Sequence, residues 1–589
     1  MMKNKPAVKG TGLRSVGQRL LAHPVYLAVS LVCAVLYVAV NLYTPKLTGD
    51  AVDLIVGKGQ VDFEGILRLL AIFGGAVILG SVFQWIISVC TGNMAYLVAR
   101  DLRIAAFDKL QELPVGYIDS HSRGDIMNRI ISDTEQIESG LVMSIQGLLT
   151  GVLTVVSIIV ILFIQSAVVA VVVLVVTPLS LFVAAFIAKK SFAYFKEQSR
   201  TRGEITGLMD EAVNFQRTVR GNNAEAEFLR RFDKINDETE KASLKAVFVS
   251  SMTNPSTRLI NNIVFAGVAL TGALTVVSGR ISVGDLSCFL SYTNQYTKPF
   301  NEITGILSEL QNAAACADRV FELLCEESQT PEPEDAAEFA NISGEVVLDS
   351  VYFSYVPERP LIEDVDLTVK PGQKVALVGP TGCGKTTFIN LLMRFYDVTD
   401  GAIWVDGVDV RDATRRSLRG SFGMVLQDTW IRRGTVRENI AMGKPDATDE
   451  EIMEAARLSH AHSFIKRLPK GYDTVIDDDD GLSEGQRQLL CIARVMLRRP
   501  PMLILDEATS SIDTRTELGV QDAFLRLMEG RTSFIVAHRL STIKEADVIL
   551  VMKDGHIIES GNHEELLAKN GFYRHLHDSQ YAGVAKSES

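Results

Sequence analysis

The chain alternates between long stretches that lack ionisable residues and long stretches that are rich in them. One membrane crossing takes roughly 20 apolar residues in a helix, so each uncharged stretch is long enough for at least one crossing. One stretch, residues 139–188, is more than twice that length and predicts two helices joined by a tight turn near residues 165–166. The stretches without Asp, Glu, Lys, Arg or His are residues 24–45, 69–99, 139–188 and 259–279. Together they predict five membrane-spanning helices.

A sixth spanning helix is predicted over residues 283–306, which are largely apolar but include Asp285, Lys298 and Glu302. Lys298 and Glu302 are four residues apart, so they share one helical face. An ionisable pair in a membrane segment is a candidate substrate site. At a rise of about 1.5 Å per residue, however, Lys298 lies about 22 Å along the helix, near the cytosolic edge. An ordinary ion pair, or a lysine that reaches the membrane surface, is therefore the favoured interpretation, and a substrate site is the alternative.

Basic residues near the start of the chain predict its orientation. Residues 1–24 contain no acidic residue and have no pattern of a cleavable signal, so this end is expected to stay in the cytosol. An even number of spans returns the other end to the same side. The loops near residues 50–64, 165–166 and 280 then face outward. The basic residues are Lys3, Lys5, Lys9, Arg14 and Arg19.

Composition agrees with a membrane part joined to a soluble part. The 589 residues have a mean hydropathy of +0.17 although 22% of them are charged. The net charge of −12 argues against nucleic-acid binding, which normally needs a basic surface. The seven cysteines form no CxxC pair, so neither disulfides nor a structural zinc site is expected.

The second half of the chain contains a phosphate-binding loop. The string GPTGCGKT (residues 379–386) lies between the strand-like run 375–378 and the helix-like run 388–395. Its glycines allow backbone N–H groups to point at phosphate oxygens at a helix N-terminus. In such loops the lysine reaches the β- and γ-phosphates, and the following hydroxyl and a carboxylate at the end of a second strand serve Mg²⁺. Lys385, Thr386 and Asp506 are the residues predicted to do so for MgATP.

Further strings resemble those of ATP-binding cassette (ABC) proteins. LSEGQ (residues 482–486), upstream of Asp506, is similar to the signature of that family, and SSID (residues 510–513) is similar to its D-loop. The resemblance implies that Tyr355 stacks on adenine, that Gln427 is the Q-loop glutamine near Mg²⁺, that Glu507 polarises the attacking water and that His538 contacts the γ-phosphate. A positioned general base contributes about 10²–10⁴-fold in rate. The expected nucleotide contacts are Tyr355, Gly379, Pro380, Thr381, Gly382, Cys383, Gly384, Lys385, Thr386, Thr387, Gln427, Ser483, Glu484, Gly485, Gln486, Asp506 and Asp513, with Thr386, Gln427 and Asp506 at the metal.

The resemblance also implies a multidomain fold. It comprises an all-α transmembrane domain of six helices, of the exporter type, followed by an α/β P-loop nucleotide-binding domain. Long intracellular extensions are expected at residues 100–138 and 189–258, with coupling helices near 117–122 and 217–225; plain amphipathic helices are the alternative. The expected boundaries are a basic N-terminus at 1–24, the transmembrane domain at 25–325, a linker at 326–341, the nucleotide-binding domain at 342–583 and a tail at 584–589.

One cassette per chain implies a half-transporter, because ABC proteins bind ATP between the phosphate loop of one cassette and the signature of another. Two departures from the family pattern bear on the partner. Glu484 replaces the usual glycine, and a carboxylate roughly 7 Å from the γ-phosphate costs about 0.6 kcal/mol in water and about 2.4 kcal/mol at an effective dielectric constant of about 20. Residues 474–481 (TVIDDDDG) replace the usual TxxGExG. These departures favour a heterodimer with a second half-transporter, and a homodimer is the alternative.

The sequence thus predicts an ATP-driven exporter in a bacterial cell (inner) membrane, with both termini cytosolic, in contact with membrane lipid and a small-molecule substrate. Five uncharged spans favour a hydrophobic or amphipathic substrate, whether drug-like, lipid or peptide. Two alternatives remain open. One is an importer on the same fold, for example of siderophores, and the other is a regulatory or channel-gating ATPase subunit.

Overall fold

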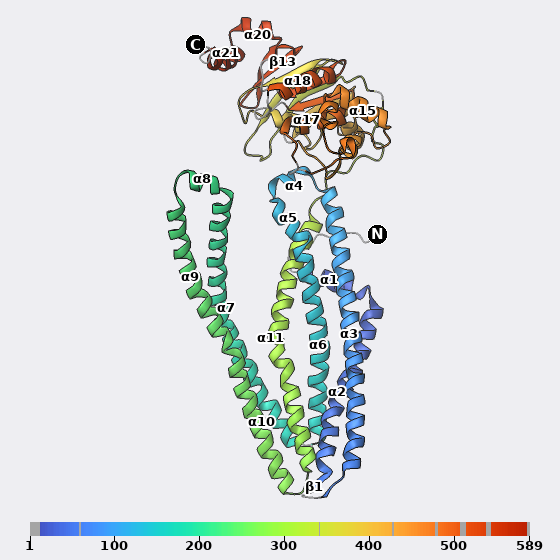
Figure 1. Cartoon of the computed structure of the whole chain (residues 1–589), viewed down its shortest axis with the longest axis vertical. Coiled ribbons are helices and arrows are strands. Elements are labelled where there is room, and N and C mark those ends of the chain that lie inside the picture. Colours follow the sequence, from blue (N-terminus) through green and yellow to red (C-terminus); the bar gives the residue numbers. More distant parts are fainter. Residues whose placement is uncertain are drawn as a thin grey trace. The chain divides into compact units, whose positions relative to one another are not determined.

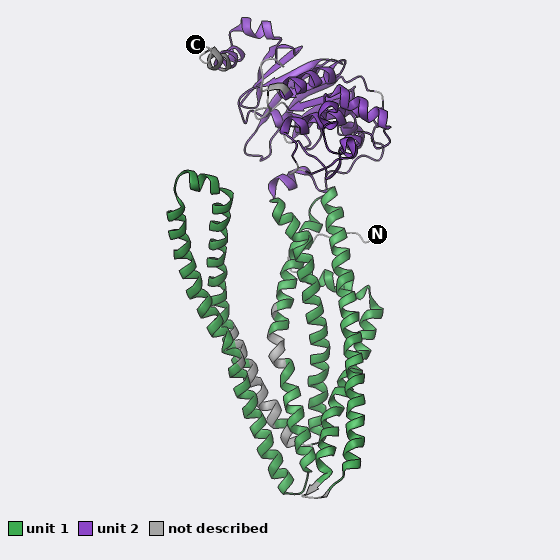
Figure 2. Cartoon of the chain, in the orientation of Figure 1, with its two compact units in different colours: residues 1–112, 122–327 green, residues 113–121, 328–589 purple. Residues whose placement is uncertain are grey.

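The computed structural model describes residues 12–57, 60–165, 167–340, 342–426, 429–477, 481–506, 514–536 and 543–585. Figure 1 shows its helices and strands, and Figure 2 colours its two compact units. The first unit comprises residues 1–112 and 122–327, and the second comprises residues 113–121 and 328–589. A short segment between two stretches of the first unit therefore belongs to the second unit.

Long helices form the first unit. The six predicted spans lie, in order, in α2 (Pro24–Asp53), α3 (Phe63–Glu112), α6 (Ser132–Gln165), α7 (Ala167–Asn214), α10 (Thr253–Val277) and α11 (Val283–Cys325). The remaining elements are α1 (Gly12–Leu21), β1 (Ile55–Gly57), β2 (Gln60–Val61), α5 (Arg123–Ile130), α8 (Gln216–Gly221) and α9 (Glu225–Ser251). Both α3 and α7 continue well past the apolar stretches, as expected for helices that extend out of a membrane.

Four helical stretches of the described residues are long and apolar enough to cross a membrane by length and composition. They are Pro24–Asp53, Phe63–Glu112, Arg123–Gln165 and Glu225–Val277. The spans predicted in α7 and α11 are not among these four. In α11 the predicted span contains Asp285, Lys298 and Glu302, the charges that made it the weakest prediction. The predicted turn between α6 and α7 includes Ser166, which lies outside the described residues.

Close contacts tie α11 to α2 and α6. A Cβ atom at Gly49 of α2 would lie 2.6 Å from the carbonyl oxygen of Gly284, so these two helices touch backbone to backbone. The Asp53 carboxylate accepts hydrogen bonds from the Ser282 hydroxyl (2.5 Å) and the Gly284 amide (2.7 Å), which caps the start of α11. Between α6 and α11, Arg319 donates two hydrogen bonds to the buried Asp133 carboxylate. Helix α11 is thereby fixed against both neighbours.

Two sheets form the centre of the second unit. The six-stranded sheet has the order β14-β13-β5-β12-β11-β8, with parallel pairing except between β13 and β14, and the antiparallel sheet has the order β4-β3-β6-β7. Buried β-branched and aliphatic residues fill both faces of the parallel strands, as expected for a sheet covered by helices. The strands are β3 (Val346–Phe353), β4 (Ile362–Val369), β5 (Lys374–Val378), β6 (Asp400–Val405), β7 (Val408–Asp409), β8 (Phe422–Val425), β11 (Met502–Asp506), β12 (Thr532–Val536), β13 (Val548–Lys553) and β14 (His556–Gly561), with a separate pair of β9 (Gly434–Thr435) and β10 (Val475–Ile476).

The helices of the second unit surround these sheets. They are α4 (Val115–Ser120), α12 (Lys385–Leu392), α13 (Arg415–Ser421), α14 (Val436–Ala441), α15 (Asp449–Leu458), α16 (His462–Ile465), α17 (Glu484–Arg498), α18 (Thr514–Met528), α20 (His563–Lys569) and α21 (Phe572–Ala585). A helical unit followed by an α/β unit confirms the predicted fold class.

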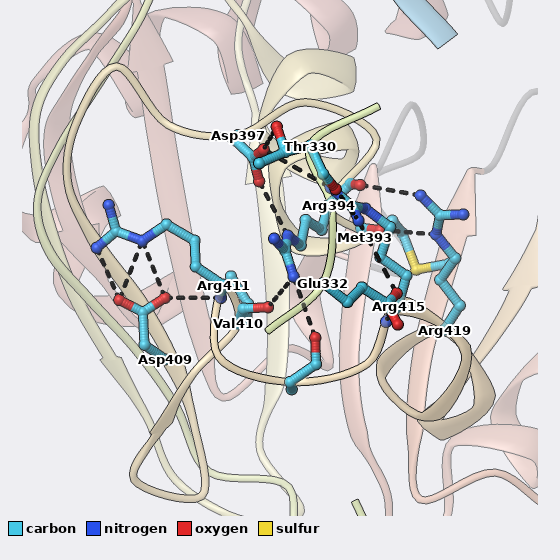
Figure 3. A network of polar contacts seen from close by, with 11 residues as sticks. Thr330, Glu332, Met393, Arg394, Asp397, Asp409, Val410, Arg411, Arg415 and Arg419 are labelled. Atoms are coloured by element: carbon cyan, nitrogen blue, oxygen red, sulfur yellow. Dashed lines mark hydrogen bonds and ion pairs between the residues drawn. The ribbon is translucent and has the colours of Figure 1, made fainter. Parts of the chain in front are cut away.

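Part of the predicted linker is bound to the second unit (Figure 3). The buried Arg415 guanidinium donates to the carbonyl of Thr330 (2.8 Å), and the Arg415 amide donates to the Glu332 carboxylate (2.8 Å). Further on, Ala337 forms a parallel β-bridge with Ala413. The sequence offered no sign of this docking, because the acidic, proline-containing segment has no apolar period.

Candidate functional site

The loop between β5 and α12 depends on its glycines. Gly384 is the N-cap of α12 with φ 105°, and Gly382 has φ 83°, both in the region that side chains disfavour. A Cβ atom at Gly379 would lie 2.2 Å from the carbonyl oxygen of Met552 on β13. The sequence therefore folds this segment into a tight turn that presents backbone N–H groups at a helix N-terminus, which is a site for phosphate.

Lys385 lies across this loop. Its side chain is almost buried, and Nζ donates to the carbonyls of Gly379 (2.8 Å) and Pro380 (3.0 Å). Cys383 is buried beneath the loop, whereas Thr386 is exposed. The loop thus presents an ammonium group and a hydroxyl from two consecutive residues.

The register of the parallel sheet brings Asp506 to the same edge. Asp506 of β11 pairs with Val536 of β12, and Val536 pairs with Leu377 of β5, two residues before the loop. The Asp506 carboxylate and the exposed Thr386 hydroxyl are hard oxygen donors, which is the donor type that Mg²⁺ prefers. The described residues of this edge therefore fit a magnesium ion. Gln427, Glu507, Asp513 and His538 lie outside the described residues.

An aromatic cluster adjoins α12. Tyr355 is 47% exposed, and its hydroxyl lies 3.2 Å from Oγ1 of the buried Thr387. Its ring packs edge to face against Phe353 and Tyr396, with centroid separations of 4.9 and 5.0 Å. These edge contacts hold the Tyr355 ring beside the loop, where an exposed aromatic face suits stacking on a base.

The same cluster contacts α4. The Tyr396 hydroxyl donates a 2.7 Å hydrogen bond to the Asp119 carboxylate, and a Cβ atom at Gly116 would lie 3.0 Å from the Tyr396 ring. Burial and the neighbouring Asp119 raise the pKa of Tyr396, so it stays a neutral donor. Helix α4 overlaps residues 117–120 of the segment predicted as the first coupling helix, residues 117–122. The second predicted segment, near 217–225, includes α8 of the first unit, which has no buried residue.

The sequence did not point to Tyr396. The only signal was its place shortly after the helix that follows the phosphate loop, and its partner Asp119 is 277 residues away.

The LSEGQ string forms the start of α17. Ser483 is the N-cap: its hydroxyl accepts from the Gln486 amide (3.3 Å), and the Gln486 side chain accepts from the Ser483 amide (3.1 Å). Glu484 is the first helical residue and is half-buried, and Gly485 is buried. The Glu484 carboxylate thus lies in the first turn of α17, where the partial positive charge of the helix attracts anions. Three of the aspartates that precede the string, residues 478–480, lie outside the described residues.

The phosphate loop lies between a parallel strand and a helix, and an acidic residue ends a strand two positions away in the sheet. Together with a separate unit of long apolar helices, this arrangement defines a membrane-associated P-loop ATPase. Residues 27–300 match the family described as ABC transporter transmembrane region, and residues 362–510 match the family described as ABC transporter. The chain belongs to the ABC transporters of exporter type, with a membrane region and an ATP-binding region fused in one polypeptide.

Relatives span nearly the whole chain. A fatty acid ABC transporter ATP-binding/permease protein of Mycobacterium bovis is 41% identical over 90% of this chain and 84% of its own length. An ATP-dependent lipid A-core flippase of Syntrophus aciditrophicus is 34% identical over 95% of this chain and 93% of its own. The structure of a bacterial Atm1-family ABC exporter with ATP bound matches with a TM-score of 0.78 and 27% identity, covering 95% of this chain and 98% of that one.

Family membership confirms the predicted class of activity. The protein is an integral membrane protein that binds and hydrolyses ATP to drive transport, and ABC exporters work as dimers. The individual roles of the site residues, the partner and the substrate remain predictions.

Proposed function

We propose that this chain is one half of an exporter that moves hydrophobic or amphipathic substrates, whether drug-like, lipid or peptide, by alternating access. The observation that carries this proposal is the contact of α4 with the cassette. In sequence, α4 lies between two helices of the transmembrane unit, yet it belongs to the compact unit that contains the phosphate loop. Asp119, Tyr396, Tyr355 and Thr387 form a series of contacts from α4 to the helix that follows the loop. Closure of the cassettes on ATP can thus be transmitted to the membrane helices.

The nucleotide site is proposed to use the loop residues 379–387 for the phosphates and Tyr355 for the adenine. Thr386, Gln427 and Asp506 hold Mg²⁺, which supplies charge neutralisation at the phosphates when bound. Glu507 acts as the general base, His538 contacts the γ-phosphate, and Asp513 belongs to the string that resembles the D-loop of the family. The donor types of Thr386 and Asp506 at one sheet edge, and the exposed Tyr355 side chain next to Thr387 of α12, support these roles.

We favour a heterodimer, in which Ser483, Glu484, Gly485 and Gln486 complete the site of the partner subunit. Placement of Glu484 at the start of α17 supports this, because its carboxylate adds negative charge at the helix terminus that faces the γ-phosphate in this family. This chain has the catalytic residues Glu507 and His538 expected of an active site. The site weakened by Glu484 would therefore be the other one, which forms between the signature of this chain and the phosphate loop of the partner. A homodimer with two such sites is the alternative.

The names of the relatives support a lipid-like substrate and outward transport. The location in the bacterial cell membrane with both termini in the cytosol is proposed from the basic residues 1–24 and the even number of predicted spans. Import on the same fold and a regulatory role are the competing hypotheses. ATP-dependent uptake into inside-out vesicles, with none into right-side-out vesicles, is expected of an exporter. The reverse pattern would establish import, and ATP hydrolysis unaffected by any substrate or membrane gradient would favour the regulatory role.

A further inference from the structure

Asp397 lies in the turn that follows α12 and contacts the segment that follows α11 (Figure 3). Its carboxylate accepts hydrogen bonds from the Arg394 guanidinium (2.9 Å) and from the Thr330 hydroxyl (3.3 Å). The Arg415 guanidinium lies 3.8 Å from the same carboxylate and donates to the Thr330 carbonyl (2.8 Å). One carboxylate thus joins two arginines of the cassette to Thr330, which follows the end of α11 at Cys325 by five residues.

Positive charge is concentrated at this turn. Arg394 and Arg415 are buried, and the half-buried Arg419 donates to the Arg394 carbonyl (2.9 Å). Burial and the neighbouring guanidinium groups lower the pKa of both Arg415 and Arg419, so these cations repel one another. Two carboxylates, Asp397 and Glu332, offset the repulsion, and Oε1 of Glu332 lies 3.9 Å from the Arg415 guanidinium. The charge balance of the turn therefore depends partly on Glu332, which belongs to the segment after α11.

The same turn supports the Tyr355 ring. Tyr396 immediately precedes Asp397, and its ring packs edge to face on Tyr355 with the centroids 5.0 Å apart. On its other side, the Tyr355 hydroxyl lies 3.2 Å from Oγ1 of Thr387 and accepts a 3.4 Å hydrogen bond from the Asn390 side chain, both on α12. A displacement of Asp397 therefore moves Tyr396, and with it one of the two supports of the Tyr355 ring.

Residues 330–337, which we call the docked segment, keep Asp397 in place. If this segment were released, Arg415 would lose both the Thr330 carbonyl and the Glu332 carboxylate. A buried cation that loses its partners is strongly destabilised. Asp397, 3.8 Å away, is a carboxylate that Arg415 can then draw toward itself and away from Arg394.

Resting on the adenine role proposed above for Tyr355, we infer that Asp397 and Arg415 are positioning residues of the nucleotide site. Through Tyr396 they set the orientation of the Tyr355 ring for as long as the docked segment is bound. The property they control is the affinity for the base, because the phosphate loop has separate supports in its glycines and in the bonds of Lys385. The chain that leaves α11 thus leads directly into the contacts that orient the adenine-binding ring.

The test compares ADP with pyrophosphate, which has the phosphates without the base. Binding is measured by calorimetry with Mg²⁺ on the full-length protein, with any co-purifying subunit, in lipid nanodiscs. Asp397→Asn is expected to raise the Kd for ADP about fivefold and to leave that for pyrophosphate within about twofold, because only the base stacks on the ring. Asp397→Glu keeps the charge and is expected to restore most of the affinity. Equal weakening of both ligands overturns the inference, since general damage to the cassette has that effect.

Glu332→Gln tests the docked segment itself. Glu332 is exposed, so this substitution removes a charge from the surface without opening the core. It is expected to raise the Kd for ADP about threefold and to leave pyrophosphate binding unchanged. Asp412→Asn is the matched control, because it removes an exposed carboxylate from the neighbouring loop, and its Kd values should equal those of the parent. Parental ADP binding in Glu332→Gln, or the same loss in Asp412→Asn, overturns the role of the docked segment.

Tyr355→Ala separates failure of the inference from failure of the proposed adenine site. In this background Asp397→Asn should cause no further loss of ADP affinity, because both substitutions act on one ring. A further loss overturns the inference, since Asp397 would then act without Tyr355. Weaker ADP binding in Tyr355→Ala, with Asp397→Asn equal to the parent, overturns the inference and leaves the adenine site standing. Unchanged ADP binding in Tyr355→Ala removes the adenine site and the inference together.

Discussion

Tyr396, at the end of the segment that follows the phosphate loop, donates a 2.7 Å hydrogen bond to Asp119 on α4. The same ring packs edge to face on Tyr355, whose hydroxyl adjoins Thr387 of α12. Tyr396 therefore touches both the segment inserted from the transmembrane sequence and the residue proposed to stack on adenine. A small movement of Tyr355 on nucleotide binding has a direct route to α4.

Removing the Tyr396 hydroxyl is expected to reduce transport per ATP hydrolysed. A hydrogen bond to an exposed carboxylate such as Asp119 contributes about 1 kcal/mol, or about fivefold. Tyr396→Phe and Asp119→Asn should each lower the ratio of substrate transported to ATP hydrolysed in proteoliposomes. The double variant should be no worse than either single one, because both remove the same bond. Additive losses would show that the two residues act separately.

Tyr355 is expected to contribute to ATP affinity through its ring. Stacking of an aromatic ring on a base contributes about 1–3 kcal/mol, so Tyr355→Ala should raise the Kd for ATP about fivefold or more. Tyr355→Phe keeps the ring and loses only the hydroxyl next to Thr387. Its Kd, measured by calorimetry, should stay within about twofold of the parent. Similar Kd values for the alanine variant and the parent would remove Tyr355 from the adenine site.

Glu507→Gln should retain ATP binding and lose turnover. The amide keeps the size of the side chain but cannot take a proton from water, and a positioned base contributes about 10²–10⁴-fold. ATP hydrolysis by the purified variant should therefore fall at least a hundredfold, with the Kd for ATP unchanged. Glu529→Gln, at an exposed glutamate, is the matched control. Turnover at the parental rate would exclude Glu507 as the base.

The local pattern of residues was enough to predict the long helices and the phosphate loop. Contacts between residues far apart in the sequence could not be predicted in this way. Uncharged stretches predicted five of the long helices and a largely apolar stretch predicted the sixth, because a membrane span is a property of one continuous segment. The loop at residues 379–386 was predictable for the same reason: its glycines and Lys385 act within a few residues. The contact of Tyr396 with Asp119 and that of Arg415 with Thr330 join residues far apart in sequence, and no local periodicity encodes them.

Arg415 is expected to keep the segment after the transmembrane helices docked. Its buried guanidinium bonds the Thr330 carbonyl, and loss of a buried hydrogen bond to a charged group costs about 1–3 kcal/mol. Arg415→Ala should therefore speed amide hydrogen exchange at Ala337, whose N–H bonds the carbonyl of Asp412, by about fivefold or more. Arg416→Ala changes an exposed neighbour and should leave that exchange rate alone. Equal exchange in all three proteins would mean that the β-bridge holds the segment without Arg415.

Glu484 offers the most direct test of the proposed asymmetry. If its carboxylate opposes the γ-phosphate bound across the dimer interface, Glu484→Gln should tighten nucleotide-dependent cassette closure about 3- to 60-fold, the range that corresponds to about 0.6–2.4 kcal/mol. Glu484→Gly removes the same charge but also a side chain from the first turn of α17, so comparison of the two variants separates the effect of charge from that of helix stability.

Cassette closure is measured as the amount of ATP trapped by the protein purified from its native membrane. Any protein that co-purifies in equal amount is identified by sequencing. A second half-transporter with an LSGGQ signature and a residue other than Glu after its Walker B aspartate establishes the heterodimer. Recovery of this chain alone, with trapping unchanged in both variants, means a homodimer in which the Glu484 carboxylate does not face the nucleotide.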